Sequence, residues 1–379
     1  MENCRFITEK ELIHLLLENS CEDMDFVAWC QSQWQLDGVR AYMEKLRESI
    51  NHPISGILLI MAHPIQGYVL KPEQISFFPE DHIQIYYFQP DKDEKGSLCS
   101  PEEEQNTTEM RRKDFHILYP VFFRSDFALK IQKISGRKCY LVALDEGFAC
   151  YKGVLFWAGV TYTQTHSLIK AADYYFYRIK NEAIRKIHHI EAVKFFILKK
   201  KSGTLIPNPN VLPYYQKKYQ TTLYTPEPLT NKPWAIFFSQ PFIFLEDSQT
   251  DQILQHLSSI EKLLNQNGID FFIKPHPRDL ENGNVYQANG FTLINEPKLS
   301  GEEFIRRQPL KPVSVFGISS TTLLSCSLFF DLPTISLAKI MYPFFHSQVY
   351  RSQIRDFEKW TQNIVHIIPS EEEIIRFLK

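Results

Sequence analysis

Short apolar runs alternate with segments of helical periodicity along both halves of the chain, and no other feature of the sequence limits its fold as strongly. Apolar residues at helical spacing predict helices at 9–18, 36–50, 127–134, 250–267 and 319–329. Compact apolar runs predict strands at 25–30, 54–62, 82–88, 138–144, 234–238, 269–273 and 313–316. Strands that alternate with helices form parallel sheets with helices on both faces, so the sequence predicts an α/β fold.

The length of the chain and one proline-rich stretch divide this pattern in two. At ~150 residues per domain, 379 residues allow two or three domains. Hydrophobic residues make up 44% of the chain, which is enough for two ordinary cores. Residues 202–232 are rich in Pro, Tyr, Gln and Thr, which is the composition of a linker. We therefore expect two Rossmann-like, doubly wound domains, at 1–220 and 221–379, that face a central cleft.

Charge and cysteine usage exclude several classes of protein. The formal net charge of −2 argues against a dedicated nucleic-acid binder, which would carry a strongly basic surface. The seven cysteines are dispersed and lack C-x-x-C spacing, so we expect no disulfide framework and no metal site, and a reducing cytoplasm fits best. The N-terminus lacks a signal-peptide pattern, and no window reaches the ~18 apolar residues of a membrane span. We expect a cytoplasmic protein, either soluble or resting on the inner face of the cytoplasmic membrane.

Polar residues directly follow four of the predicted strands. Ligands of open parallel sheets bind outside the carboxyl ends of the strands, so these residues are the first candidates for a site. The four segments are Asp145-Glu146-Gly147, Ser239-Gln240-Pro241, Lys274-Pro275-His276-Pro277-Arg278 and Gly317-Ile318-Ser319-Ser320-Thr321-Thr322. We expect them to converge at one edge, where they would form a single site.

The acidic pair is suited to general-base catalysis. A carboxylate that is partly desolvated in a cleft can accept the proton of an attacking hydroxyl, an effect worth ~10²–10⁴ in rate. Adjacent side chains at a strand end do not point the same way, so at most one of Asp145 and Glu146 is the working base. Gly147 allows a tight turn or the close approach of a substrate. The alternative is that the pair only caps a helix or a turn.

The histidine and serine segments are suited to binding a phosphate. Prolines on both sides fix the backbone around His276, and an imidazole held in this way can donate to a phosphate and favour its departure. Gly317 lets the chain turn, and the hydroxyls and free amides at the helix start around Ser319 and Ser320 can hold phosphate oxygens. Alternatively, His276 is a loop histidine with local partners, and the serines form an ordinary N-cap.

In this order, the motifs Asp145-Glu146-Gly147, His276-Pro277 and Ser319-Ser320 resemble those shared by several families of bacterial sialyltransferases. The enzymes that sialylate lipooligosaccharide and capsule chains are the most similar, with bacterial polysialyltransferases as near relatives. The resemblance extends over about residues 138–330 and implies the GT-B fold of two facing Rossmann-like domains. It also implies transfer of sialic acid, with inversion, from CMP-sialic acid to a hydroxyl of a surface polysaccharide or lipooligosaccharide, on a galactoside or sialoside.

The same resemblance implies a role for each residue. Glu146 would be the general base, with Asp145 beside it, while His276 would contact the phosphate of CMP and Ser319 and Ser320 would bind its oxygens. The donor side would further include Gly317, Ser239, Gln240, Lys274 and Pro277, and the acceptor side Gly147 and His63. Because these groups meet the phosphate charge, we expect neither a metal ion nor any other cofactor.

A basic stretch with many aromatic residues extends over 166–201. Such a surface can meet anionic lipid, or a lipid-linked anionic glycan, at the inner face of the membrane. The alternative is a pair of core-packed helices with a solvated basic face.

Two other functions fit the same motifs. Transferases of other cytidine-activated groups, such as CMP-3-deoxy-octulosonate, also use histidine and serine pairs around the nucleotide. A non-catalytic protein that binds a nucleotide or a glycan is the third interpretation. The sequence leaves open the linkage, the acceptor, single addition or polymerisation, and the oligomeric state.

Overall fold

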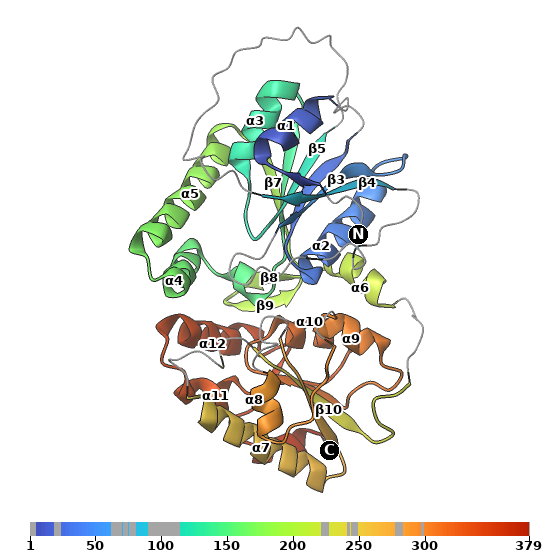
Figure 1. Cartoon of the computed structure of the whole chain (residues 1–379), viewed down its shortest axis with the longest axis vertical. Coiled ribbons are helices and arrows are strands. Elements are labelled where there is room, and N and C mark those ends of the chain that lie inside the picture. Colours follow the sequence, from blue (N-terminus) through green and yellow to red (C-terminus); the bar gives the residue numbers. More distant parts are fainter. Residues whose placement is uncertain are drawn as a thin grey trace. The chain divides into compact units, whose positions relative to one another are not determined.

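The computed structural model describes residues 5–18, 24–61, 70, 75, 81–89, 114–220, 227–240, 243, 249–276, 283–296 and 299–378. The chain divides into two compact units (Figure 1). The first unit holds Met1–Asp145 and Phe176–Phe195, and the second holds Glu146–Tyr175 and Phe196–Lys379. Residues 146–175 and 196–220, which the sequence assigns to the first domain, therefore group with the C-terminal sheet.

The first unit contains a parallel sheet of seven strands. In spatial order they are β1 (Phe6–Ile7), β4 (His82–Phe88), β3 (Ser55–Met61), β2 (Phe26–Cys30), β5 (Phe115–Pro120), β6 (Cys139–Leu144) and β7 (Glu191–Phe195). From β2 the chain adds β3 and β4 on one side, and then crosses over to add β5, β6 and β7 on the other. Apart from the edge strand β1, this is the strand order of the Rossmann fold.

Helices cover both faces of this sheet, because residues along each strand point alternately to the two faces. On one face, α1 (Glu9–Glu18) and α3 (Ser125–Ser135) pack around the buried indole of Trp29. On the other face, α2 (Gln33–Arg47) places the buried ring of Tyr42 against β5 and β7. Figure 1 shows α1 and α3 on one side of the strands and α2 on the other.

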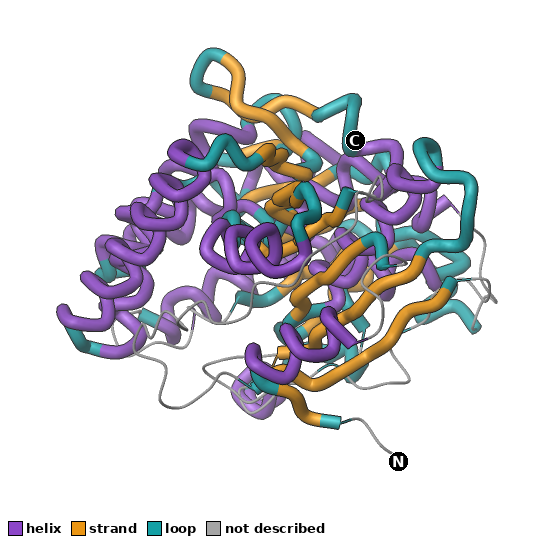
Figure 2. Tube along the Cα trace, turned by 90° about the horizontal axis from the view of Figure 1, so that it is seen from above, coloured by secondary structure: helices purple, strands orange, loops and turns teal. Residues whose placement is uncertain are grey.

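The second unit contains a parallel sheet of five strands. Their spatial order is β11 (Asp270–Lys274), β10 (Trp234–Phe238), β12 (Ser314–Gly317), β13 (Thr334–Ser336) and β14 (His366–Ile367). This is the second common order of doubly wound folds, and the direction of winding reverses between β10 and β12. In Figure 2 the strands of both sheets appear in orange among purple helices.

Alternation along β10 again distributes side chains to two layers of helices. Phe237 lies in the core that contains Leu257 of α7 (Thr250–Gln266), whereas Trp234 lies edge-on to Phe304 of α9 (Gly301–Arg307) on the opposite face. The remaining elements are η3 (Phe148–Tyr151), α4 (Val154–Thr165), α5 (Leu168–Ile187), β8 (Leu198–Lys201), β9 (Thr204–Pro207), α6 (Leu212–Gln220), α8 (Gly283–Ala288), α10 (Thr321–Phe330), α11 (Ala338–Met341), η6 (Tyr342–Phe344), α12 (Gln348–Thr361) and α13 (Glu372–Leu378). No helix in the described parts of the chain is long and apolar enough to cross a bilayer.

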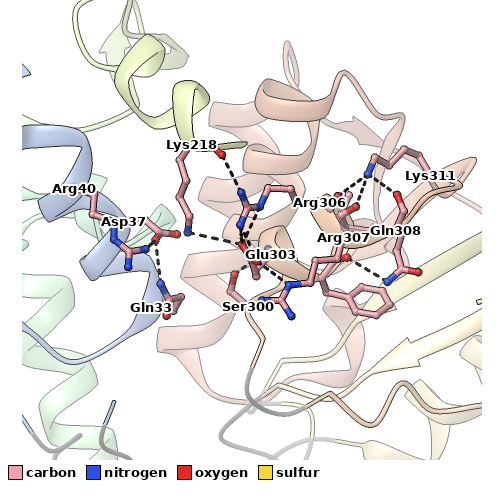
Figure 3. Close-up of polar contacts among 12 residues, drawn as sticks. Gln33, Asp37, Arg40, Lys218, Ser300, Glu303, Arg306, Arg307, Gln308 and Lys311 are labelled. Atoms are coloured by element: carbon pink, nitrogen blue, oxygen red, sulfur yellow. Dashed lines mark hydrogen bonds and ion pairs between the residues drawn. The ribbon is translucent and has the colours of Figure 1, made fainter. Parts of the chain in front are cut away.

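The predicted α/β class is confirmed, and the helices and strands expected from periodicity are present with small shifts at their ends. The prediction of a linker over 202–232 is wrong for its first part, which forms β9 and α6. Tyr219 of α6 stacks on Phe329 with ring centroids 4.9 Å apart. Figure 3 shows Arg306 of α9 donating to the carbonyl of Lys218, at 3.2 Å. A tyrosine of this supposed linker and the backbone of α6 therefore pack the helix onto the second unit.

Candidate active site

Three strand ends of the second unit lie side by side, because β10 pairs in parallel with both β11 and β12. Polar residues follow each of these ends, at the point where the winding of the sheet reverses. They are Ser239 and Gln240 after β10, His276 after β11, and Ser319 and Ser320 after β12. This place in a doubly wound sheet is where ligands bind. The structure thus brings three of the four predicted segments to one sheet edge.

Gln240 joins the ends of β10 and β12. Its Oε1 accepts a hydrogen bond from the amide of Ser319 at 2.7 Å, and its Nε2 lies 3.4 Å from Ser319 Oγ. Gln353 of α12 donates to the same hydroxyl at 3.3 Å. A hydroxyl accepts two hydrogen bonds and donates one. Two amides already donate to Ser319 Oγ. The hydroxyl can therefore interact with a ligand oxygen by donating its proton.

Ser320 is the N-cap of α10. Its Oγ accepts from the amide of Thr322 at 3.2 Å, so the N-cap interpretation is confirmed for this residue. A cap does not exclude anion binding, because the hydroxyl keeps a proton to donate. The amides of the first turn also lie at the positive end of the helix dipole.

The acidic turn packs against the start of the same helix. Gly147 has a φ of 92° and a ψ of −164°, a combination that is essentially restricted to glycine. A Cβ on Gly147 would lie 2.1 Å from Thr321 Oγ1, and the amide of Phe148 donates to that oxygen at 2.9 Å. Glu146 and Gly147 therefore belong to the second unit, whereas the sequence places the acid in the first domain.

The two carboxylates of the pair have different surroundings. Asp145 is fully buried, and its Oδ1 accepts a hydrogen bond from Nε1 of Trp34 at 3.3 Å. Glu146 is partly exposed. Burial against an indole keeps Asp145 away from solvent, so Glu146 is the carboxylate of the pair that solvent reaches.

His276 is partly exposed, two residues beyond the end of β11, but Lys274 is buried. The Lys274 ammonium donates to the carbonyl of Glu296 at 2.9 Å. Desolvation lowers the pKa of Lys274 to about 8, against the opposing influence of Glu296 and Glu302. The Lys274 ammonium, which the sequence places on the donor side, thus has the carbonyl of Glu296 as a partner within the protein.

Two further residues belong to the predicted donor side. Ser239 has a hydrogen-bond partner within the protein, and Gly317 has room for a Cβ. Ser239 Oγ lies 2.7 Å from the hydroxyl of Tyr286, and both residues are buried. Gly317 has no positive φ, and a Cβ there would meet Leu323 at 3.4 Å, in ordinary contact, so its backbone does not require glycine.

His63 and Pro277 lie outside the described residues. Within the described ranges, no group of three or more His, Cys, Asp or Glu side chains could hold a metal ion. Sequence reasoning missed Gln353 and Trp34, which contact the site residues from helices that carry no motif. Only the packing of α2 and α12 in the folded chain shows that these two side chains reach Asp145 and Ser319.

Comparison with known proteins gives a family and several similar folds. Residues 26–339 match the family described as Alpha-2,8-polysialyltransferase (POLYST). A solved alpha/beta-galactoside alpha-2,3-sialyltransferase from Photobacterium phosphoreum has 11% identity over 91% of this chain and 98% of its own, with a TM-score of 0.46. A sialyltransferase from Photobacterium damsela has 12% identity over 91% of this chain and 81% of its own, with a TM-score of 0.42. For ADP-heptose LPS heptosyltransferase II of E. coli these values are 11%, 94%, 98% and 0.40. No curated protein matches the chain.

Proposed function

The chain belongs to the alpha-2,8-polysialyltransferase family and is therefore a glycosyltransferase of the sialyltransferase kind; we propose that it moves sialic acid from CMP-sialic acid to a hydroxyl of an acceptor glycan. The proposed acceptor is a galactoside or sialoside of a bacterial surface polysaccharide or lipooligosaccharide. One observation carries the proposal: the turn that holds Glu146 packs on Thr321, at the start of the helix that bears the phosphate-binding hydroxyls. This contact supports the proposal that Glu146 and the phosphate-binding hydroxyls act in one site.

In the proposed reaction, Glu146 accepts the proton of the acceptor hydroxyl. The oxygen attacks the anomeric carbon of sialic acid while the bond from that carbon to the phosphate oxygen of CMP breaks. The electron pair of that bond leaves with CMP, and the single displacement inverts the anomeric centre. Asp145 does not take part in proton transfer, but its bond to Trp34 holds the preceding strand end in place.

The leaving phosphate is met by groups that are already in position. Ser319 donates its hydroxyl proton to a phosphate oxygen, and the amides at the start of α10 contribute the positive end of the helix dipole. His276 stabilises the departing phosphate by donating a proton or a hydrogen bond. Donors held in place by Gln240 and Gln353 need little reorganisation during the reaction, which is the condition for strong electrostatic stabilisation. We propose on this basis that transfer needs no metal ion, and that it continues at full rate in EDTA.

The test is incubation with CMP-sialic acid and a panel of labelled galactosides and sialosides, followed by mass and linkage analysis of the products. Glu146→Gln should lower kcat by ~10²–10⁴, because a general base contributes about that much. Asp145→Asn is the matched control, because an amide oxygen can still accept from Trp34, and it should cause a far smaller loss.

Three results would overturn parts of the proposal. Transfer from CMP-3-deoxy-octulosonate but not from CMP-sialic acid would replace the donor. Full activity of Glu146→Gln would remove the base. Binding of CMP without transfer from any donor would indicate a nucleotide-binding module.

We also propose that the protein rests on anionic lipid at the inner face of the cytoplasmic membrane. Lys199, Lys200 and Lys201 of β8 are exposed. Helix α4 has no charged residue and buries none of its residues, and Leu155 within it is 74% exposed. Exposed apolar and basic side chains are what an interfacial segment needs. Changing the three lysines to glutamate should abolish sedimentation with phosphatidylserine liposomes. If the unmodified protein does not sediment with these liposomes, the proposed membrane contact is refuted.

A further inference from the structure

Helix α12 (Gln348–Thr361) contacts both parts of the proposed site through one of its faces. The residues that make these contacts are spaced three to four positions apart, or are direct neighbours, so they share a side of the helix. They are Ser352, Gln353, Asp356, Phe357 and Trp360. On the phosphate side, Gln353 donates to the hydroxyl of Ser319 at 3.3 Å.

On the acid side, the partner of α12 is Lys152. Its side chain is 2% exposed, and its ammonium forms an ion pair with the carboxylate of Asp356. The same ammonium donates to the carbonyl of Ser352 at 3.2 Å. It also lies 4.8 Å from the ring centroid of Trp360. Lys152 directly follows η3, the short helix that begins after Glu146-Gly147.

The aromatic contacts fix the other end of η3 to the same face. The ring of Phe148 lies 4.9 Å from that of Phe357 and 5.6 Å from that of Trp360, both measured between centroids. Its amide is the one that donates to Thr321 Oγ1. The segment from Glu146 to Lys152 is therefore held at its start by α10 and α12 and at its end by α12.

The Lys152 charge depends on Asp356 for compensation. Desolvation lowers the pKa of Lys152, and the bond to Asp356 is the main influence that raises it again, while Lys200 and Arg355 add to the lowering. Asp356 itself is 33% exposed and loses less hydration. Removing the Asp356 charge therefore leaves a buried ammonium whose remaining partners are the carbonyl of Ser352 and the faces of three aromatic rings, none of which carries a negative charge. The uncompensated charge favours movement of the end of η3 towards water.

We propose that Lys152 and Asp356 are positioning residues: their ion pair fixes η3 on α12 and thereby sets the place of Glu146 relative to Ser319. Both would act through the turn that carries Glu146. The catalytic consequence of the pair rests on the proposed function, whereas its hold on the acidic turn does not. Activity and local structure therefore give two separate readouts.

The experiment compares the full-length protein with its Asp356→Asn variant by hydrogen–deuterium exchange and by kinetics. Exchange at the amides of 148–152 should become ~10-fold faster or more, because the segment opens locally without its anchor. The kcat for transfer should fall ~10–100-fold, the scale expected from displacement of a catalytic group by about an ångström. The KM for CMP-sialic acid should stay within about twofold, because Gln240 and Gln353 still hold Ser319.

Two control variants accompany it. Asp356→Glu keeps the charge and should restore most of both readouts. Glu371→Gln breaks an ion pair of the same unit, with His256, that touches none of the site residues, and it should change neither readout.

The outcomes test the anchoring of the acidic turn separately from the proposed function. Unchanged exchange at 148–152 in Asp356→Asn overturns the inference whatever the activity. Faster exchange throughout the second sheet, with kcat and KM both impaired, also overturns it, because the pair would then serve general stability. A wild-type protein that transfers no sialic acid, combined with faster exchange confined to 148–152, refutes the proposed function but supports the anchoring of the acidic turn.

Discussion

Replacing Gly147 by alanine tests the packing on which the site depends. The φ and ψ of this residue, 92° and −164°, lie in a region that costs other residues ~1–3 kcal/mol. The new Cβ would also lie 2.1 Å from Thr321 Oγ1, so the threonine must move. Its hydrogen bond from the amide of Phe148 would then be lost, at a further ~0.5–1.5 kcal/mol. We expect Gly147→Ala to lower the free energy of unfolding of the second unit by ~2–4 kcal/mol.

The measurement is thermal unfolding followed by near-UV circular dichroism. A loss of this size lowers Tm by roughly 4–16 °C in a unit of this length. Gly317→Ala is the matched control, because its Cβ would be 3.4 Å from Leu323 in ordinary contact, and its Tm should stay within about 2 °C of wild type. The transfer rate should fall with Gly147→Ala, since this change displaces the turn that carries Glu146.

A double-mutant cycle with Thr321→Ala checks that the clash is the cause. Both changes act on the same oxygen, so their effects on stability should not add, and the double variant should be more stable than the sum predicts by ~1 kcal/mol. Strictly additive effects, or a Gly147→Ala protein with the Tm of wild type, would refute the reasoning.

Three further predictions follow from individual contacts. Ser320→Ala removes the N-cap of α10 and should cost ~1 kcal/mol in unfolding free energy. Ser319→Ala leaves the side-chain amides of Gln240 and Gln353 without their acceptor, so it should cost ~1–3 kcal/mol and also weaken CMP binding in calorimetry. CMP binding by Ser319→Ala with the affinity of wild type would contradict the assignment. Burial lowers the pKa of His116 from 6.5 to about 4. His116 is then neutral in the folded protein at pH values where it takes up a proton in the unfolded chain. Its contribution to the free energy of unfolding is therefore complete above pH 6.5 and falls by ~3 kcal/mol towards pH 4. Urea unfolding at several pH values should show this fall relative to His116→Phe, and parallel profiles would disprove it. Arg124→Met removes a buried guanidinium that bonds Glu9 at 2.7 Å, and should destabilise the first unit by ~3–5 kcal/mol in urea; a wild-type midpoint would contradict this.

Local sequence determines the elements of this fold and the chemistry available at their ends. The apolar run Trp234–Phe238 becomes β10 with the bounds that periodicity predicts, because alternation and helical spacing depend only on near neighbours. The motif residues follow their strands for the same reason. The acidic pair, His276 and the two serines could therefore be chosen as candidates before any contact was known.

The tertiary structure decides which of these candidates meet and what each can do. Lys274 and His276 are two residues apart, yet their surroundings differ. Lys274 is buried and donates to a carbonyl, whereas His276 is partly exposed, because burial depends on the helices that cover the sheet. Residues 204–220 have the composition of a linker, but α6 within them contacts Arg306 and Phe329, about a hundred positions further along the chain. Gln353 reaches Ser319 only through the strand order and the packing of α12. Contacts of this range depend on topology, which periodicity along the chain does not encode.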